Sequence, residues 1–107
     1  MNILLLGAGH IGRTLVEALH EEHDITVIDA DPAHLAALSG RFDVRTVEGD
    51  GTTKAVVRHA GVEDADLFIG CSPREEANLI CAMLVKRFSR AQTIIRTASA
   101  AYLEAWR

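Results

Sequence analysis

The chain lacks the features that would suit it to a membrane or to nucleic acid. None of its apolar runs approaches the roughly 18 residues of a membrane-spanning helix, and Met1-Asn2-Ile3 leads into an expected strand rather than a signal peptide. Its 11 Lys and Arg residues against 15 Asp and Glu residues give a net charge of −4. Nonspecific nucleic-acid binding needs a basic face that displaces counterions. We therefore expect a soluble, cytoplasmic protein that binds no nucleic acid.

Cysteines and catalytic signatures are also scarce. Cys71 and Cys81 lie among apolar residues without the spacing of a metal site, which is typical of reduced packing residues. Four histidines lie at expected helix ends and loops without a common spacing, so no metal site is predicted; they are His20, His23, His34 and His59. The chain has no GxSxG elbow, HExxH pair, P-loop lysine or recognisable pair of Cys and His. These absences favour a binding protein over an enzyme.

What the chain does contain is an alternation of short apolar segments with helical patterns. The segments are ILLL, ITVI, VRTV, DLFIG and TIIR, at residues 3–6, 25–28, 44–47, 66–70 and 93–96. This alternation indicates βαβ units and a parallel sheet. The first and fourth segments are almost continuously apolar, as central strands are, whereas the third is typical of an edge strand. We predict one domain, residues 1–107, with a Rossmann-like, doubly wound α/β fold of about five parallel strands in the order 3-2-1-4-5.

Four helices are expected between these strands. Three of them span residues 11–22, 32–39 and 52–60, and the fourth begins at a capping box formed by Ser72 and Glu75. The inward stripe of the first helix is expected to comprise Ile11, Leu15, Val16 and Leu19.

Two features of the last third point beyond this chain. The fourth helix is apolar almost all the way round from Leu79 to Val85, which exceeds what one sheet face needs and implies a partner surface. A final helix from about Ala98 breaks off at Trp106-Arg107 with no following strand. We expect the chain to be a fragment of a longer protein, truncated before the sixth strand of the fold.

The first strand runs straight into the motif Gly-x-Gly-x-x-Gly, formed by Gly7, Gly9 and Gly12. In a dinucleotide-binding fingerprint the first glycine permits a tight turn, the second lets the backbone approach a pyrophosphate, and the third lets the helix pack closely. Phosphate oxygens would meet free N–H groups at the positive end of that helix. His10, inside this loop, could touch a phosphate or the second nucleoside. A mere packing turn is the alternative.

Asp29 closes the second apolar segment, about 20 residues beyond the glycines, where the fingerprint places an acid on the adenosine ribose. This position predicts hydrogen bonds to both ribose hydroxyls. Its charge would repel a 2′-phosphate, which disfavours NADP. The alternative is a loop acid or a cap for the following turn. Asp31 is a further candidate ligand-binding residue, with the N-cap of the second helix as its alternative role.

Further candidates follow the third and fourth strands, whose carboxyl ends border the same crevice. Asp50 could reach adenine, or Asp50 or Thr52 could cap the third helix. Ser72 could face the distal half of a ligand or cap the fourth helix. Glu76 and Asn78 are similarly ambiguous, because a solvated helix start also accounts for them.

With these residues in place, the chain resembles the nucleotide-binding N-terminal subdomain of the RCK or KTN family, of the TrkA-N type. The resemblance covers essentially all of the sequence. Its most specific elements are the pattern VxGDGT-x7-AG-x2-DAD, from Val47 to Asp66, and SxxEExN, from Ser72 to Asn78. The resemblance implies a regulatory domain that gates a potassium channel or transporter when NAD(H), ATP or ADP exchange in its crevice, and it implies no enzyme.

The resemblance also implies a ligand set. The implied contacts are phosphates at Gly7, Gly9, His10, Ile11 and Gly12, the ribose at Asp29, adenine at Asp50, Gly51 and Thr52, and the distal part of the ligand at Ser72, Glu76 and Asn78. Arg96 matches an arginine at the end of the fifth strand, whereas Ala98 stands where the family often has a second one. The implied protein is a homo-oligomer that lies on the inner face of the membrane through a channel or transporter subunit.

Two other interpretations remain open. The chain could be the cofactor-binding part of an NAD-dependent dehydrogenase, although residues 72–85 suit an assembly helix and offer no acid–base residue for hydride chemistry. It could also be a ligand-free oligomerisation module, against which the intact glycine motif and Asp29 argue. The sequence does not separate NAD(H) from ATP or ADP, because all of them share the adenosine half.

Overall fold

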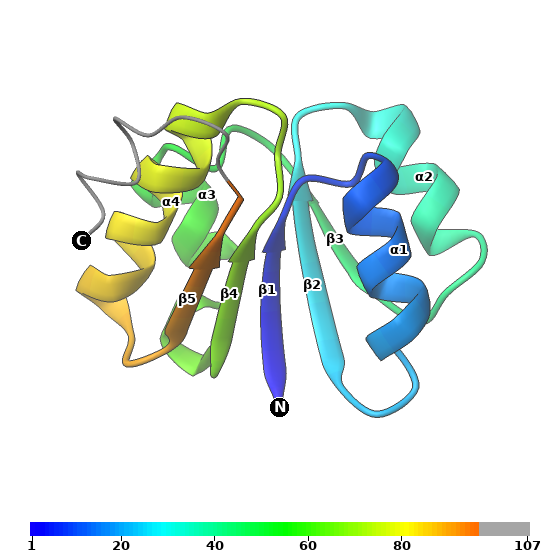
Figure 1. Cartoon of the computed structure of the whole chain (residues 1–107), viewed down its shortest axis with the longest axis horizontal. Helices are drawn as coiled ribbons and strands as arrows, with labels where there is room; N and C mark the ends of the chain where they lie inside the picture. The colour runs from blue at the N-terminus through cyan, green and yellow to red at the C-terminus, as the bar shows by residue number, and fades with distance from the viewer. Residues whose placement is uncertain (97–107) are drawn as a thin grey trace.

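The computed structural model describes residues 1–96, which form a five-stranded parallel sheet with helices on both faces (Figure 1). The strands are β1 (Asn2–Leu6), β2 (Asp24–Asp29), β3 (Arg45–Glu48), β4 (Leu67–Gly70) and β5 (Gln92–Ile95). They lie in the order β3-β2-β1-β4-β5, which confirms the predicted fold class and strand order. As predicted, β1 is central and almost fully buried, and β3 is an edge strand.

The helices divide between the two faces of the sheet (Figure 1). One face carries α1 (His10–Leu19) and α2 (Pro32–Ser39), and the other carries α3 (Lys54–His59), the short 3-10 helix η1 (Val62–Asp64) and α4 (Glu75–Phe88). This division follows from right-handed connections between parallel strands, because the chain changes direction across the sheet after β3. The strand order therefore reverses between β1 and β4.

Each face of the sheet has its own apolar core, because successive strand residues point to opposite faces. Leu4, Leu6 and Phe68 pack with Val57 of α3 and Cys81 of α4. A second set of buried apolar side chains packs together on the other face: Ile3, Leu5, Ile25, Val27, Val16, Leu35 and Leu38. Burial on both faces explains why β1 has an almost uninterrupted apolar sequence.

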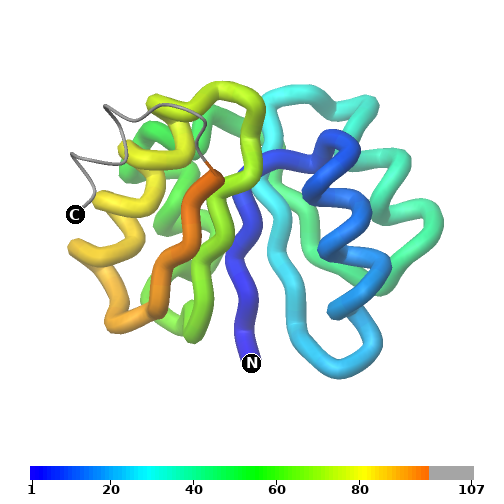
Figure 2. The backbone as a smooth tube through the Cα atoms, viewed as in Figure 1, coloured from blue at the N-terminus to red at the C-terminus, as the bar shows by residue number. Residues whose placement is uncertain are grey.

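The strands end together at one edge of the sheet, and their hydrogen-bond ladder continues into the loops. Leu6 pairs with Ile28 and with Gly70. Beyond these pairs, the Gly7 N–H donates to the Ile28 carbonyl at 2.9 Å, and the Cys71 N–H donates to the Leu6 carbonyl at 2.9 Å. Figure 2 shows the resulting loops along the upper edge of the sheet. These bonds hold the loop backbones at fixed positions before any ligand arrives.

Two helices are shorter than the sequence suggested. The first helix ends at Leu19 rather than Glu22, because β2 already begins at Asp24 and the intervening residues reverse the chain. Ile11 is 37% exposed, which corrects its place in the inward stripe. The inward face runs through Gly12 and Val16. Successive residues are about 100° apart around a helix, so Ile11, which precedes Gly12, is turned away from that face.

The third helix begins at Lys54 rather than Thr52, with Thr53 as its N-cap. Asp50 accounts for the difference, because it holds both threonines in a turn. Its carboxylate accepts from the Thr52 N–H at 2.9 Å, and its carbonyl accepts from the Thr53 hydroxyl at 2.8 Å. The expectation that Asp50 or Thr52 caps the third helix is therefore wrong, since these bonds form the turn before it.

The fourth helix exposes apolar side chains, as its sequence indicated. Ile80 is 42% exposed and Met83 is 60% exposed, whereas Cys81 and Val85 are buried against the sheet. The partner surface inferred from this pattern stays a prediction, and the final helix from Ala98 lies outside the described residues. Among residues 1–96, no helix has both the length and the apolarity of a membrane span.

Asn78 is the buried polar residue that fastens α4 to the ends of β4 and β5. Its side chain is fully buried. The amide oxygen accepts from the Ser72 N–H at 2.9 Å, and the amide nitrogen donates to the Ser72 carbonyl at 2.9 Å and to the Arg96 carbonyl at 3.1 Å. One side chain thus satisfies three backbone groups at the edge of the sheet that carries the loops.

We predict that Asn78→Ala lowers the free energy of unfolding by about 1–3 kcal/mol, because it leaves buried backbone groups without partners. Urea unfolding monitored by circular dichroism measures the change. Ser72→Ala is the matched control, since it removes only an exposed hydroxyl that accepts from the Arg74 N–H, and it should cost less than about 1 kcal/mol. Equal losses in the two variants would contradict this role for Asn78.

Both cysteines are free and buried, as expected for packing residues. Burial raises the pKa of the Cys71 thiol to about 11 and the pKa of the Cys81 thiol to about 12. Unfolded thiols ionise near a pKa of about 8.5, so the unfolded chain releases their protons at a lower pH than the folded chain does. The thiol contribution to stability is therefore complete below about pH 8.5 and declines as the pH rises toward the folded-state values.

Urea unfolding between pH 8 and pH 10.5 tests this effect. We expect the free energy of unfolding to fall by up to about 1.4 kcal/mol per pH unit for each thiol in the upper part of that range. The variant with both Cys71→Ala and Cys81→Ala should show a shallower decline, because only the other titrating groups remain. Parallel declines in the two proteins would contradict the raised thiol pKa values.

Candidate nucleotide-binding site

A groove of about 410 Å³ lies at the edge of the sheet where the parallel strands end. In doubly wound sheets, ligands bind at this edge, beside the point where the strand order reverses. The groove is lined by Leu6, Gly7, Gly9, Ile28, Asp29, Ala30, His34, Gly49, Asp50, Gly51, Ser72, Pro73, Arg74 and Ala77. These residues come from the ends of strands, from the loops after four different strands and from two helices, so the fold rather than the local sequence assembles the groove.

The glycine loop forms one wall of the groove. Gly7 has φ +107°, a conformation that side chains rarely adopt, and a Cβ there would lie 2.9 Å from the Ser72 nitrogen. A Cβ at Gly12 would overlap the Gly7 carbonyl oxygen, so the third glycine is required for close packing. A Cβ at Gly9 would meet no atom within 4 Å. Gly9 is therefore not required for packing, and its bare backbone borders open space in the groove.

The start of α1 suits an anion. The N-cap is Gly9, which has no side chain that could cap the helix, and the first turn contains no acidic residue. The N–H groups of a first turn have no partner within the helix, and the helix dipole adds positive charge at that end. The chain thus presents backbone donors beside the open space at Gly9. This arrangement fits the pyrophosphate that the glycine motif predicted.

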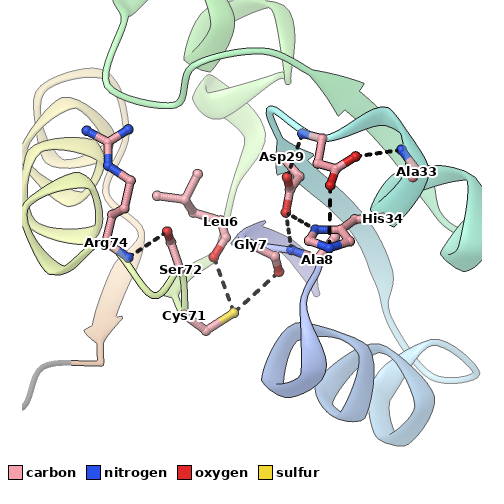
Figure 3. Close-up of polar contacts among 10 residues, drawn as sticks. Leu6, Gly7, Ala8, Asp29, Ala33, His34, Cys71, Ser72 and Arg74 are labelled. Atoms are coloured by element: carbon pink, nitrogen blue, oxygen red, sulfur yellow. Dashed lines mark hydrogen bonds and ion pairs between the residues drawn. The ribbon is translucent and has the colours of Figure 1, made fainter.

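Asp29 reaches the groove from the end of β2, and its carboxylate braces two loops (Figure 3). Oδ2 accepts from the Ala8 N–H at 2.7 Å, and Oδ1 accepts from the Asp31 N–H at 2.8 Å. The side chain is still 15% exposed. Because a carboxylate has about four lone-pair sites, both oxygens keep capacity for ribose hydroxyls. The loop-acid role and the ribose role are therefore compatible.

Asp50 stands on the β3–α3 loop, with its carboxylate held by Thr52. The Thr52 hydroxyl donates to Oδ1 at 2.6 Å, and the Thr52 N–H donates to the same oxygen at 2.9 Å. These two bonds lower the pKa of Asp50, with a smaller contribution from the charge of Arg74. Asp50 is therefore an ionised acceptor on the groove, while Thr52 serves to orient it.

The β4–α4 loop forms the opposite wall, and here the predicted capping box is wrong. The helix begins at Glu75 with Arg74 as its N-cap, and the N-cap makes no side-chain bond. The Ser72 hydroxyl instead accepts from the Arg74 N–H at 3.1 Å, within the turn before the helix. Figure 3 shows Ser72 and Arg74 across the glycine loop from Asp29. Ser72 thus lines the groove, and its contact with the distal half of a ligand stays a prediction.

The structure brings only part of the predicted ligand set to the groove. The predicted residues that line it are Gly7, Gly9, Asp29, Asp50, Gly51 and Ser72. Those that do not line it are His10, Ile11, Gly12, Asp31, Thr52, Glu76, Asn78 and Arg96.

The second group has other positions and contacts. Asn78 is fully buried and uses its whole amide on backbone groups, which corrects its predicted place beside the ligand. Asp31 caps α2, with Oδ1 accepting from the Ala33 N–H at 2.9 Å, as its alternative role predicted. The carboxylate of Glu76 pairs with the Arg74 guanidinium at 3.3 Å. The Glu76 backbone N–H and that guanidinium lower the pKa of Glu76.

Two polar groove residues escaped the sequence analysis. His34 lies on the first turn of α2, with ring nitrogens 3.5 Å from Asp29 Oδ2 and 3.6 Å from Asp31 Oδ2. Its position three residues after the N-cap was the available signal, because that spacing returns a side chain toward the helix start. Arg74 lines the opposite wall, and its place immediately after Pro73 gave no comparable signal.

Elsewhere on the described surface, another groove is a weaker candidate for a ligand-binding site. A second groove, of about 170 Å³, lies between Asn2, Arg45 and Asp64 near the amino ends of β1 and β2. It is less than half the size of the first, and the helix start on its lining is that of the three-residue 3-10 helix η1, at Gly61. Among residues 1–96, no group of three or more His, Cys, Asp or Glu side chains is arranged to hold a metal ion.

Solved structures share this fold. The GsuK channel bound to NAD superposes with a TM-score of 0.82 and 21% identity, over 97% of this chain and 19% of that one. The Shewanella denitrificans Kef C-terminal domain in its AMP-bound form superposes with a TM-score of 0.80 and 16% identity, over 99% of this chain and 65% of that one. At these identities the likeness concerns the fold alone.

Sequence comparison defines the family. The Trk system potassium uptake protein TrkA of Halomonas elongata is 45% identical over 105 residues, which are 96% of this chain and 23% of that protein. The chain thus spans about a quarter of the length of this relative. The family model of the TrkA-N domain matches residues 3–107. The resemblance predicted from the motifs is thereby confirmed, and the chain belongs to the TrkA-N domain family.

Proposed function

We propose that the groove binds an adenine nucleotide, NAD(H) or ATP/ADP, with its phosphates on the first turn of α1 and its ribose on Asp29. The observation that carries this proposal is the convergence of three features: the open space at Gly9 in the groove, the acid-free start of α1 beside it, and the partly exposed Asp29 carboxylate. The first two suit a phosphate, and the third suits a diol. In this chain the loops at the carboxyl ends of the parallel strands bring them together.

We further propose that this domain is part of a longer regulatory protein, not an enzyme, that controls potassium uptake. The relative that is 45% identical is named as a potassium uptake protein, which supports this role. In such a protein the domain would form a homo-oligomer and lie on the cytoplasmic face of a membrane channel or transporter subunit. A nucleotide can regulate such an assembly only if it binds two conformations of the assembly with different affinities.

The alternative from the enzyme class is the cofactor-binding part of an NAD-dependent dehydrogenase. Both proposals place the same nucleotide in the same groove, so binding alone does not separate them. Potassium uptake by cells that carry the full-length protein does separate them, because a cofactor domain would have no effect on uptake.

Calorimetric titration of the chain with NAD, NADH, ATP, ADP and NADPH tests nucleotide binding. We expect saturable binding of at least one nucleotide with a free 2′-hydroxyl. Gly9→Ala should weaken that binding by at least about tenfold, or 1.4 kcal/mol, because its methyl group occupies the space beside the phosphate donors. Its free energy of unfolding should fall by no more than about 1 kcal/mol, the cost of an alanine at an N-cap, since the new Cβ meets no atom within 4 Å.

Two controls sharpen this test. Glu17→Ala changes an exposed residue of α1 and should leave both affinity and stability unchanged. Gly12→Ala should instead destabilise the fold, because its Cβ would overlap the Gly7 carbonyl oxygen. Absence of binding by all five nucleotides would refute the proposal for this chain. Unchanged affinity in Gly9→Ala would place the phosphates elsewhere.

The regulatory role gives a separate prediction. In cells that depend on the full-length protein for potassium uptake, we expect Gly9→Ala to change the uptake rate while the protein remains at its normal level. The physical reason is that a domain without its ligand can no longer respond to it. Uptake measured with rubidium, alongside an immunoblot for protein level, provides the check. Wild-type uptake in a variant that has lost nucleotide binding would argue against regulation through this groove.

A further inference from the structure

The imidazole of His34 lies beside two acids at one end of the groove, Asp29 on its lining and Asp31 next to it (Figure 3). We call this pair of acids the acidic corner. Nδ1 lies 3.5 Å from Asp29 Oδ2, and Nε2 lies 3.6 Å from Asp31 Oδ2. The His34 side chain is 50% exposed, as is that of Asp31. The two ring nitrogens therefore face two different carboxylates at the distances of ion pairs rather than of short hydrogen bonds.

The neutral and the protonated imidazole differ in the number of N–H donors and in the charge that they place beside Asp29 and Asp31. A neutral imidazole has one N–H, so it can donate toward only one of the two carboxylates. A protonated imidazole donates from both nitrogens and adds a positive charge between them. Histidine is the side chain that ordinarily changes charge between pH 5 and pH 8. With the ring neutral, the corner carries the charges of the two carboxylates, and with the ring protonated, the charge of the ring offsets one of them.

Other charged groups surround the groove, but they stand on other elements. Asp50 lies on the β3–α3 loop and Arg74 precedes α4. Glu48 is the register partner of Asp29, and His10 lies in the first turn of α1. Among residues 1–96, Asp29 and Asp31 are the carboxylates within 4 Å of the His34 ring. Protonation of His34 therefore acts first on these two acids.

These acids are the groups that a 2′-phosphate would meet. With the ribose on Asp29, a phosphate on its 2′-oxygen would lie beside the carboxylates and be repelled. Nucleotide-binding folds that accept a 2′-phosphate do so with a nearby arginine cation. Protonated His34 supplies a cation at the same corner, and neutral His34 does not.

We propose that His34 is a specificity-determining residue of this groove, whose protonation reduces the discrimination against 2′-phosphorylated nucleotides. The inference rests on the proposed nucleotide site, and it adds to that site a proton-dependent choice between two classes of ligand. At high pH the corner selects a free 2′-hydroxyl. At low pH it also tolerates a 2′-phosphate.

The test compares AMP with adenosine 2′,5′-bisphosphate, which differ only in the 2′-phosphate and share the adenosine of all the candidate ligands. Their dissociation constants are measured by NMR titration of the chain between pH 5.5 and pH 8. Effects on the common part of the ligand cancel in the ratio of the two constants. The 2′-phosphate itself gains a proton near pH 6, so part of any change in the ratio belongs to the ligand. A variant without the imidazole isolates that part.

We expect the ratio of the bisphosphate constant to the AMP constant to fall by about tenfold or more from pH 8 to pH 5.5 in the wild type. In His34→Gln the fall should be at least about threefold smaller, because only the ligand titrates. In His34→Arg the ratio at pH 8 should already be lower than the wild-type ratio at pH 8 by about threefold or more, the part of the fall that His34→Gln lacks, since the cation is permanent.

The outcomes separate this inference from the function on which it rests. A His34→Gln profile that coincides with the wild type, together with an unchanged ratio in His34→Arg at pH 8, would overturn the role of His34 alone. Absence of AMP binding at every pH would overturn the nucleotide site and this inference with it. Because His34 is half exposed on a helix surface, neither variant is expected to disturb folding, and thermal unfolding of both verifies this.

Discussion

The hydrogen bond from the Ala8 N–H to Asp29 Oδ2, at 2.7 Å, is the contact on which the groove depends. It joins the glycine loop to the end of β2, two segments that are 21 residues apart in the sequence. The other oxygen of Asp29 holds the start of the β2–α2 loop through Asp31. One carboxylate thus fixes the separation between the phosphate donors and the ribose acceptor. A groove braced in this way needs little rearrangement to take a rigid ligand, which reduces the entropic cost of binding.

The same constraint explains why the glycines are not equivalent. Gly7 and Gly12 are required by the folded chain itself, through a left-handed backbone conformation and a close approach to a carbonyl oxygen. Gly9 has no such requirement, because the space beside it is empty. A small residue at a position that packing leaves open is most simply explained by a ligand that approaches the backbone. The motif therefore combines two positions for folding with one for binding.

Sequence reasoning succeeded where a pattern is local. Alternating segments predicted the strand order, and motif spacing predicted Gly7 and Asp29 as groove residues. It failed where a side chain serves a distant partner. In the sequence Asn78 resembles a ligand-binding residue. In the structure its side-chain amide is hydrogen-bonded to the backbone of Ser72 and to the carbonyl of Arg96, which is 18 residues away. The role of Asn78 is set by tertiary contacts that no local periodicity encodes. Ser72 failed for a different reason, because it has the spacing of a capping box but its hydroxyl accepts from the Arg74 N–H two residues on, in the turn before the helix.

The central claim is that an adenine nucleotide occupies the groove between the glycine loop and Asp29. A crystal structure of the chain grown with ADP tests it most directly, because ADP carries both the phosphates and the ribose that the groove is built to hold. The account predicts phosphate oxygens on the N–H groups of the first turn of α1 and ribose hydroxyls on the Asp29 carboxylate. ADP bound instead in the groove beside Arg45, or a structure at saturating ADP with no nucleotide bound, would contradict it.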